Sequence, residues 1–304
     1  MGVINRANFA KDLYPGVNKW FGMSYAEYPN EFLQIFKKNT SSKAFEEEMG
    51  ISTMGLLQQK TEGGGIAYDE MAQGSLYRYT FATYALGFMI TRELYEDGLA
   101  VTQGMRRAQA LAFSARQTQE TIAANLLNRA FTAGYTFIDG KKPCDTARPL
   151  GRFGGTWANT PSVSADLSES ALEQACIDIG NFVNDRGLKI AIRPMKLVIP
   201  TALEFEAARI LKSDKQSGTN YNDINAMKTM GKFPGGVVTN HYLTDTNAWF
   251  ILTDCPDGMK YFERRALAFD TDNDWETENA KFKCTFRAGW GCTDVSGIYG
   301  SAGA

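Results

Sequence analysis

The feature that most constrains how this chain folds is the alternating run at residues 76–90, LYRYTFATYALGFMI. Aromatic or apolar residues occupy every second position, first the odd positions and then the even ones: Tyr77, Tyr79 and Phe81, followed by Leu86, Phe88 and Ile90. Alternation of period two with one change of phase, near Tyr84, predicts a long β-strand that contains a bulge. Such a strand extends about 50 Å at about 3.3 Å per residue, so we predict a long ribbon.

The sequence before this run predicts the other half of a hairpin. Three consecutive glycines, Gly63, Gly64 and Gly65, suit a flexible bend, because glycine adopts backbone conformations that other residues avoid. The segment 54–65 is predicted to supply the returning strand. A projecting hairpin has unpaired strand edges, which a monomer has to protect. We therefore expect another subunit to receive the hairpin.

The rest of the chain predicts a mixture of helices and strands. The longest helical pattern covers residues 99–131, where apolar residues recur at steps of three and four. A helix of about thirty residues measures roughly 45 Å. Residues 1–30 are predicted to be an arm that lies on another surface. Shorter elements follow from the same patterns: helices at 30–39, at 168–185 and directly after Pro200, and strands at 188–200, 236–244, 248–254 and 278–292.

Composition excludes several classes of protein. The 304 residues are 44% hydrophobic and 22% charged, which is ordinary for a globular protein. The formal net charge of -2 gives no basic field that would attract nucleic acid or an anionic membrane. No apolar run is long enough to span a bilayer, and the N-terminal residues have no apolar signal core. The five cysteines are scattered and odd in number, which favours a reducing cytoplasm over a disulfide framework.

Residues that could carry chemistry are few. His241 is the only histidine, and we predict that it packs structurally or makes a surface hydrogen bond. Cys284 and Cys292 are predicted to be buried, inert thiols, because they lack the close spacing of a zinc site. The run Glu46–Glu48 is predicted to be a solvated acidic patch. Asp270, Asp272 and Asp274 resemble the start of a calcium loop, but Trp275 stands where that loop needs glycine. We therefore expect no catalytic residue, metal or cofactor, and predict that the protein is not an enzyme.

Four stretches together resemble one protein family: GFMITRELYEDGL at 87–99, RPMKLVIPTALEFEAARIL at 193–211, the residues 219–254, and the residues 272–301. They resemble, in this order, the junction of an extended loop with a spine helix, the strand–proline–helix that leads into an axial domain, an axial loop with its following strands, and the closing strands of a peripheral domain. The family is that of the major capsid proteins of tailed bacteriophages, with the Hong Kong 97-like coat fold. The resemblance runs from about residue 50 to the end.

The resemblance implies an α+β fold, the Hong Kong 97-like phage capsid fold, divided into five segments. These are an N-terminal arm and short helix at 1–55, an extended β-hairpin loop at 56–90, a peripheral domain with the spine helix at 91–189, an axial domain at 190–275, and a C-terminal return to the peripheral domain at 276–304. The loop around 213–236 would point to the centre of a pentamer or hexamer.

It also implies a structural role in the virion: self-assembly, in the host cytoplasm, of the icosahedral head shell around double-stranded DNA. The implied partners are copies of the chain in pentamers and hexamers, a portal protein, a scaffold or cement protein, and packaged DNA contacted non-specifically, with no membrane. Predicted contact residues are Tyr77, Arg78, Tyr79, Phe81 and Tyr84; predicted flexible joints are Gly63, Gly64, Gly65 and Gly87. Two alternatives stay open. One is an encapsulin-like nanocompartment shell that holds protein cargo, and the other is a hydrolase that uses acidic residues with a cysteine or His241.

Overall fold

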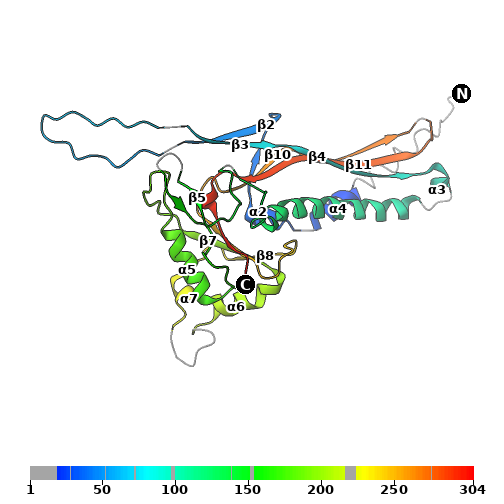
Figure 1. Ribbon diagram of the computed structural model, residues 1–304. Helices are drawn as coiled ribbons and strands as arrows, with labels where there is room; N and C mark the ends of the chain where they lie inside the picture. The colour runs from blue at the N-terminus through cyan, green and yellow to red at the C-terminus, as the bar shows by residue number, and fades with distance from the viewer. Residues whose placement is uncertain are drawn as a thin grey trace.

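The computed structural model describes residues 19–304 apart from residues 28, 52, 72, 97–99, 138, 151–153, 216–223 and 275. Most of the predicted N-terminal arm, residues 1–18, lies outside the described residues. The described chain forms two units, each built on its own four-stranded sheet, and a long loop projects to one side of them (Figure 1). We call them the spine unit, which contains the longest helix, and the compact unit, which contains the C-terminus.

The spine unit is a sheet of order β1-β10-β11-β4 with helix α4 packed along it (Figure 1). Its elements are β1 (Lys37–Thr40), β4 (Ala82–Ile90), α3 (Arg92–Glu96), α4 (Ala100–Asn128), β10 (Met259–Asn273) and β11 (Ala280–Cys292). Every second side chain of β11, from Ala280 to Ala288, is buried, so one face of the strand packs inward along its length. Helix α4 presents small side chains such as Ala108 and Ala112, both fully buried, which allow close packing. The predicted helix at 99–131 is thus confirmed.

The segment before β1 packs on α4. Residues 19–27 are helical, and Phe21 is buried among side chains of α4 and β11. Helix α2 (Phe32–Ile35) buries both of its end residues, which confirms an amphipathic helix here, but it is shorter than the predicted 30–39 because the chain enters β1 at Lys37. The carboxylate of Glu120 in α4 accepts hydrogen bonds from the backbone N–H groups of Glu31 (2.8 Å) and Phe32 (3.0 Å). This part of the arm therefore belongs to the chain's own body.

The compact unit is a sheet of order β12-β9-β7-β8, with helices packed on it. Its elements are α5 (Glu169–Gly180), β7 (Pro194–Pro200), η3 (Thr201–Leu203), α6 (Glu204–Lys212), α7 (Ala226–Met230), β8 (Val237–Asn240), β9 (Trp249–Thr253), η4 (Val295–Gly297) and β12 (Ile298–Ser301), and a short pair, β5 (Arg148–Pro149) with β6 (Thr156–Trp157), precedes them. Strand β7 is buried on both faces. Leu197 packs with the helices of the compact unit, whereas Val198 packs with the end of α4, and this shared strand joins the two units.

The observed units differ from the predicted segments at three places. Strand β10 falls in the predicted axial segment 190–275, but it pairs with β11 in the spine unit. Helix α5 falls in the predicted peripheral segment 91–189, but its buried side chains pack with β7 and β9 of the compact unit. Strand β12 falls in the predicted return at 276–304, yet it completes the sheet of the compact unit. The chain leaves the compact unit after β9, forms the β10–β11 hairpin in the spine unit and returns to the compact unit at β12. Each unit is therefore built from several separate ranges of residues.

The predicted hairpin exists with a different second strand. Strand β3 (Gln73–Thr80) pairs with β2 (Phe45–Ile51), and the predicted partner segment 54–65 has no strand. The change of phase is confirmed: Tyr79 and Phe81 are buried at odd positions, whereas Ile90 is buried at an even one. Its cause is a change of partner near Phe81, where the chain leaves β2 and joins β11, with regular β4–β11 pairing instead of a bulge.

Candidate inter-subunit interface

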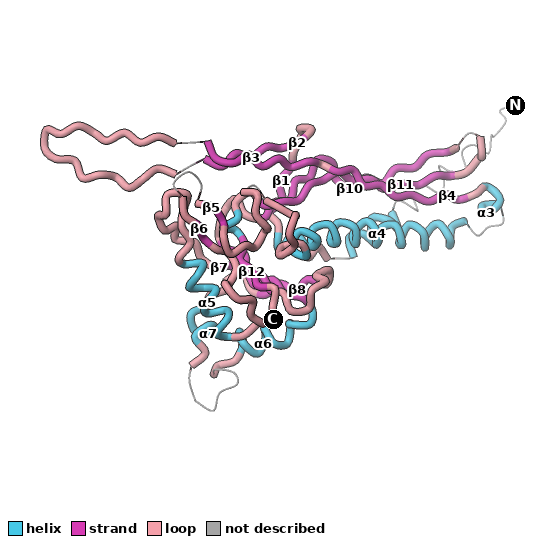
Figure 2. The backbone as a smooth tube through the Cα atoms, in the orientation of Figure 1, coloured by secondary structure: helices cyan, strands magenta, loops and turns pink. Residues whose placement is uncertain are grey.

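A loop at residues 53–71, here called the projecting loop, extends away from both units between β2 and β3 (Figures 1 and 2). Its two extended legs meet at a turn in which the N–H of Gly64 donates to the carbonyl of Thr61 at 3.0 Å. Gly63 has φ +72°, in the left-handed region that favours glycine. The bend predicted at the three glycines is therefore confirmed, and its flexibility stays a prediction.

The projecting loop displays large apolar side chains to solvent. They are Met54, Leu56, Leu57, Ile66, Tyr68 and Met71. The two most exposed, Leu57 and Tyr68, expose 101% and 94% of their surface. Clustered apolar side chains of this kind mark surfaces that a partner covers, because burying them removes apolar area from water. Sequence reasoning missed these residues, although the apolar pairs on either side of the glycine bend were a visible signal.

The base of the hairpin is, in contrast, packed into the chain's own body. Tyr79 exposes 2% of its surface, its ring lies 4.6 Å from that of Phe262, and its hydroxyl shares a 2.6 Å hydrogen bond with Thr293. A Cβ at Gly291 would stand 2.6 Å from the hydroxyl of Tyr77 and 2.6 Å from the ring of Tyr79. Because Gly291 in β11 has no side chain, the rings of Tyr77 and Tyr79 from β3 can lie against this strand.

Glu48 joins this base to β10. The ammonium of Lys260, buried to 5% exposure, lies 2.7 Å from both carboxylate oxygens of Glu48 and 2.8 Å from Asp257. Burial alone lowers the pKa of Lys260, but the hydrogen bonds that its ammonium donates to Asp257 and Glu48 outweigh burial and raise this pKa overall. Glu46 and Glu47 also pair with basic residues, at 2.9 Å to Lys43 and 2.7 Å to Arg78. The acidic run Glu46–Glu48 thus lies at least partly at the surface, as predicted, and each of its carboxylates pairs with its own cation.

The five predicted contact residues differ in how far they are buried within their own chain. Tyr79 and Phe81 are buried and Tyr77 and Tyr84 are half-buried, with the ring of Tyr84 stacked on that of Phe286. For Tyr79 and Phe81 this burial within one chain contradicts a contact with a neighbour. Arg78 is exposed beside Glu47, so its contact role stays a proposal.

Gly87 does not have the environment of a joint. It pairs with Lys283 in the middle of the β4–β11 ladder, with regular pairing on both sides. A Cβ there would stand 2.5 Å from the carbonyl oxygen of Phe282. The position therefore requires glycine for close backbone approach, which differs from the predicted flexible role.

The side chains considered for chemistry are engaged in structural contacts. The imidazole Nδ1 of His241 lies 2.6 Å from the carboxylate of Glu31, which is the surface hydrogen bond that was predicted. Cys284 and Cys292 are buried, as predicted. The carboxylate of Asp274 lies 2.6 Å from Lys281, and this hydrogen bond lowers its pKa. Among the described residues no group of three or more histidine, cysteine, aspartate or glutamate side chains could hold a metal ion. In the same part of the chain, no helix has the length and hydropathy to cross a membrane.

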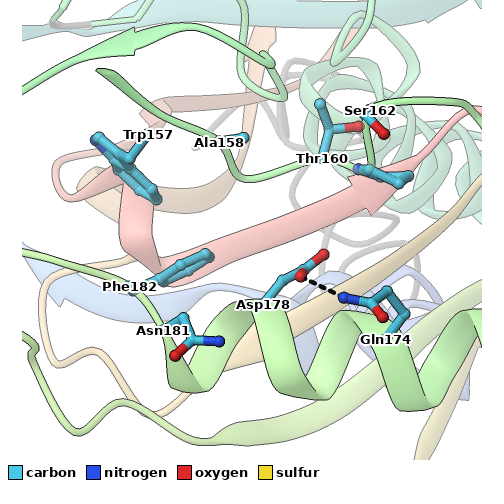
Figure 3. A pocket seen from close by; sticks show the side chains of 9 residues that line it. Trp157, Ala158, Thr160, Ser162, Gln174, Asp178, Asn181 and Phe182 are labelled. Atoms are coloured by element: carbon cyan, nitrogen blue, oxygen red, sulfur yellow. Dashed lines mark hydrogen bonds between the residues drawn. The ribbon is translucent and has the colours of Figure 1, made fainter. Parts of the chain in front are cut away.

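An open hollow of about 430 Å³ lies in the compact unit between α5 and the residues that follow β6 (Figure 3). Asp178 is the single ionisable residue among those that line it. Its carboxylate accepts hydrogen bonds from Gln174 and from the hydroxyl of Tyr299, each at 2.8 Å. A carboxylate held by two donors, without a second acid or base in the hollow, serves the packing of α5 against β12.

A helix-backed sheet, a second unit and a projecting hairpin together define a shell-forming protein with the Hong Kong 97-like coat fold. The family described as phage capsid protein matches residues 76–301, and the chain belongs to this family. Comparison with curated protein sequences finds no match.

Solved structures share the fold at low sequence identity. The virus-like particle from Pyrococcus furiosus is 12% identical, with a TM-score of 0.54 over 95% of this chain and 98% of that chain. The capsid of Myoviridae phage XM1 is 14% identical, with a TM-score of 0.52 over 91% and 92%. The procapsid of bacteriophage JBD30 is 14% identical, with a TM-score of 0.51 over 97% and 75%. The predicted fold class and family are thus confirmed.

Proposed function

We propose that this chain is the major head protein of a tailed phage and that it self-assembles into an icosahedral shell around double-stranded DNA. The observation that carries the proposal is the projecting loop, whose apolar side chains, such as Leu57 and Tyr68, are not covered by any described residue of their own chain. Copies of the same chain supply the covering surface. A shell repeats each contact many times, so modest contacts suffice for a stable whole.

The proposed cargo is DNA. The formal net charge of -2 suits a container wall, because a strongly basic wall would grip packaged DNA and hinder its movement. The capsid of phage XM1 and the virus-like particle from Pyrococcus furiosus both resemble this chain, so the fold alone does not select the cargo. The match to the phage capsid family favours the phage head over an encapsulin-like compartment.

The remaining partners follow from this role. A shell that admits DNA needs a portal protein at one vertex, and a scaffold or cement protein would set its size or reinforce it. Assembly takes place in the host cytoplasm, and contacts with DNA are non-specific. The peripheral and axial domains of the family correspond to the spine unit and the compact unit, and the joints at Gly63–Gly65 let the loop fit both pentamers and hexamers.

The test is assembly of the purified chain, followed by analysis of natural particles. Sedimentation and electron microscopy are expected to show capsomers or closed shells at near-physiological salt. A stable monomer at high concentration would contradict the proposal. Particles isolated from the source that encodes the chain are expected to protect double-stranded DNA from nuclease. Particles that hold one defined protein and no DNA would support the encapsulin-like alternative instead.

A further inference from the structure

The neck of the projecting loop is held by a turn of the compact unit. Both legs of the loop meet Arg186, which lies in the turn that follows α5. Its Nε donates to the carbonyl of Thr53 at 2.6 Å on the first leg. On the second leg it donates to Asp69 at 2.9 Å and to the carbonyl of Glu70 at 2.9 Å, with a further guanidinium nitrogen 2.8 Å from the carboxylate of Asp69. One side chain thus joins the two legs and connects them to the compact unit.

Two neighbouring groups strengthen this contact. The carboxylate of Asp185 accepts hydrogen bonds from the backbone N–H of Thr53 at 3.1 Å and from its hydroxyl at 2.5 Å. Asp69 also accepts from the N–H of Gly55 at 2.8 Å, so it links the two legs directly. The pKa of Asp69 is lowered by the hydrogen bond from Gly55 and by the one from Arg186. The contact therefore holds an ionised carboxylate at neutral pH.

The turn that presents Arg186 is itself well anchored. The side-chain oxygen of Asn184 accepts hydrogen bonds from the N–H groups of Arg186 (3.0 Å) and Leu188 (2.9 Å). Phe182, just before the turn, is buried, and its ring lies 4.8 Å from that of Trp157 (Figure 3). The side chain of Arg186 exposes 15% of its surface. Because the backbone at Arg186 is fixed and the guanidinium is planar, the side chain loses little conformational entropy when it binds the two legs of the loop.

We propose that Arg186 is a positioning residue, which fixes the direction of the projecting loop in the free subunit and ties it to the compact unit. This inference rests on the proposed function, since the loop is taken to reach a neighbouring copy. A loop already ordered before association does not have to be ordered during it, so contact forms faster and more tightly. A movement of the compact unit would also move the loop, which couples the centre of a capsomer to the contact between neighbours.

The test compares Arg186→Ala with Lys189→Ala. Lys189 is an exposed cation close to this turn, and its ammonium donates to the side chain of Asn181 instead of to the described residues of the loop. It therefore controls for the loss of one charge and one hydrogen bond. Hydrogen–deuterium exchange is measured on dilute, unassembled subunits. In Arg186→Ala the amides of Thr53 and Gly55 are expected to exchange about ten-fold faster, because Asp69, which accepts from Gly55, loses its cation and the carbonyl of Thr53 loses its donor. Amides of β7 and β9 are expected to be unchanged, and Arg186→Lys is expected to be intermediate, since it keeps the charge without the fork.

The outcomes separate this inference from the proposed function. Faster exchange in Arg186→Ala, together with slower shell assembly, supports both. Faster exchange in Arg186→Ala, when the wild-type chain itself forms no particles, supports the positioning role and contradicts the shell. Unchanged exchange at Thr53 and Gly55 overturns the positioning role, whether or not particles form. Faster exchange throughout β7 and β9 overturns it as well, because Arg186 would then only stabilise the compact unit.

Discussion

The base of the hairpin and the projecting loop are consecutive parts of one segment, and both are rich in apolar side chains. At the base, Tyr79 is covered by Phe262 and lies against Gly291 of the same chain. In the loop, Leu57 and Tyr68 are exposed, with no cover from the part of the chain that the structure describes. The comparison shows that apolar composition does not by itself identify an interface. What distinguishes the two parts is whether another strand of the chain lies within reach.

The largest difference is expected between Tyr79→Ala and Tyr68→Ala. Removal of the Tyr79 ring leaves a cavity and removes the hydrogen bond with Thr293, so the free energy of unfolding is expected to fall by about 3–5 kcal/mol. Removal of the Tyr68 ring is expected to change it by less than about 0.5 kcal/mol, because the side chain is exposed. Urea denaturation of unassembled subunits measures both. Similar losses in the two variants would remove the distinction between base and loop.

The comparison extends to two carboxylates, Glu120 in the body and Asp69 in the loop, whose pKa values are shifted in opposite directions. Burial raises the pKa of Glu120 in α4 to about 7. In the unfolded chain Glu120 ionises near pH 4.5, whereas in the folded chain it keeps its proton up to about pH 7. The free energy of unfolding therefore falls as pH rises from about 4.5 to about 7. Glu120→Gln is expected to remove this slope, which amounts to roughly 3 kcal/mol across that interval. Glu62→Gln on the projecting loop is the matched control.

Asp69 gives the opposite sign at the neck of the loop. Its pKa is lowered below 3.8, so its contact with Gly55 and Arg186 is complete above that pH and is lost as pH falls through the lowered value. Protection of the Gly55 amide, after correction for the intrinsic rate, is expected to decline only in this acid range. A decline near pH 7 would show that Asp69 does not hold the neck.

A smaller effect is expected at two glycines. A Cβ at Gly291 would meet Tyr77 and Tyr79 at 2.6 Å, so Gly291→Ala is expected to cost about 1–3 kcal/mol of unfolding free energy. A Cβ at Gly65 would meet nothing within 4 Å, so Gly65→Ala is expected to stay within about 0.5 kcal/mol. Thermal denaturation of both variants checks this. A tolerated alanine at position 291 would mean that the aromatic base is loosely packed.

The sequence predicted the fold better than the interface. Local sequence patterns determine local elements. The spacing of apolar residues in α4 and the change of phase between Phe81 and Ile90 could therefore be recognised in the sequence. The cover over Tyr79 comes from Phe262 and Thr293, which lie far along the chain, and no local pattern reports it. Likewise, two of the cations that pair with Glu46–Glu48 are distant in the sequence, Arg78 across the hairpin and Lys260 on β10, whereas Lys43 is a local partner. Only tertiary structure separates a covered aromatic residue from an exposed one.

The comparison also decides which deletion tests the loop. Removal of residues 58–84 would take out Tyr79 and Phe81 and so unfold the body, whatever the loop does. Removal of residues 54–68, closed by a short glycine linker, leaves β2, β3 and the contact between Thr53, Asp69 and Arg186 in place. The two legs already meet at Arg186, so a short linker spans the gap.

The most direct measurement of the central claim is therefore the assembly state of the chain that lacks residues 54–68. Circular dichroism is expected to show the helical signal of the full chain, with an unfolding free energy within about 1 kcal/mol of it, because the loop adds no core. Electron microscopy and sedimentation are expected to show folded subunits that form no closed shells. Loss of the helical signal would show that the loop belongs to the chain's own core, and normal shells would show that it is not the contact between subunits.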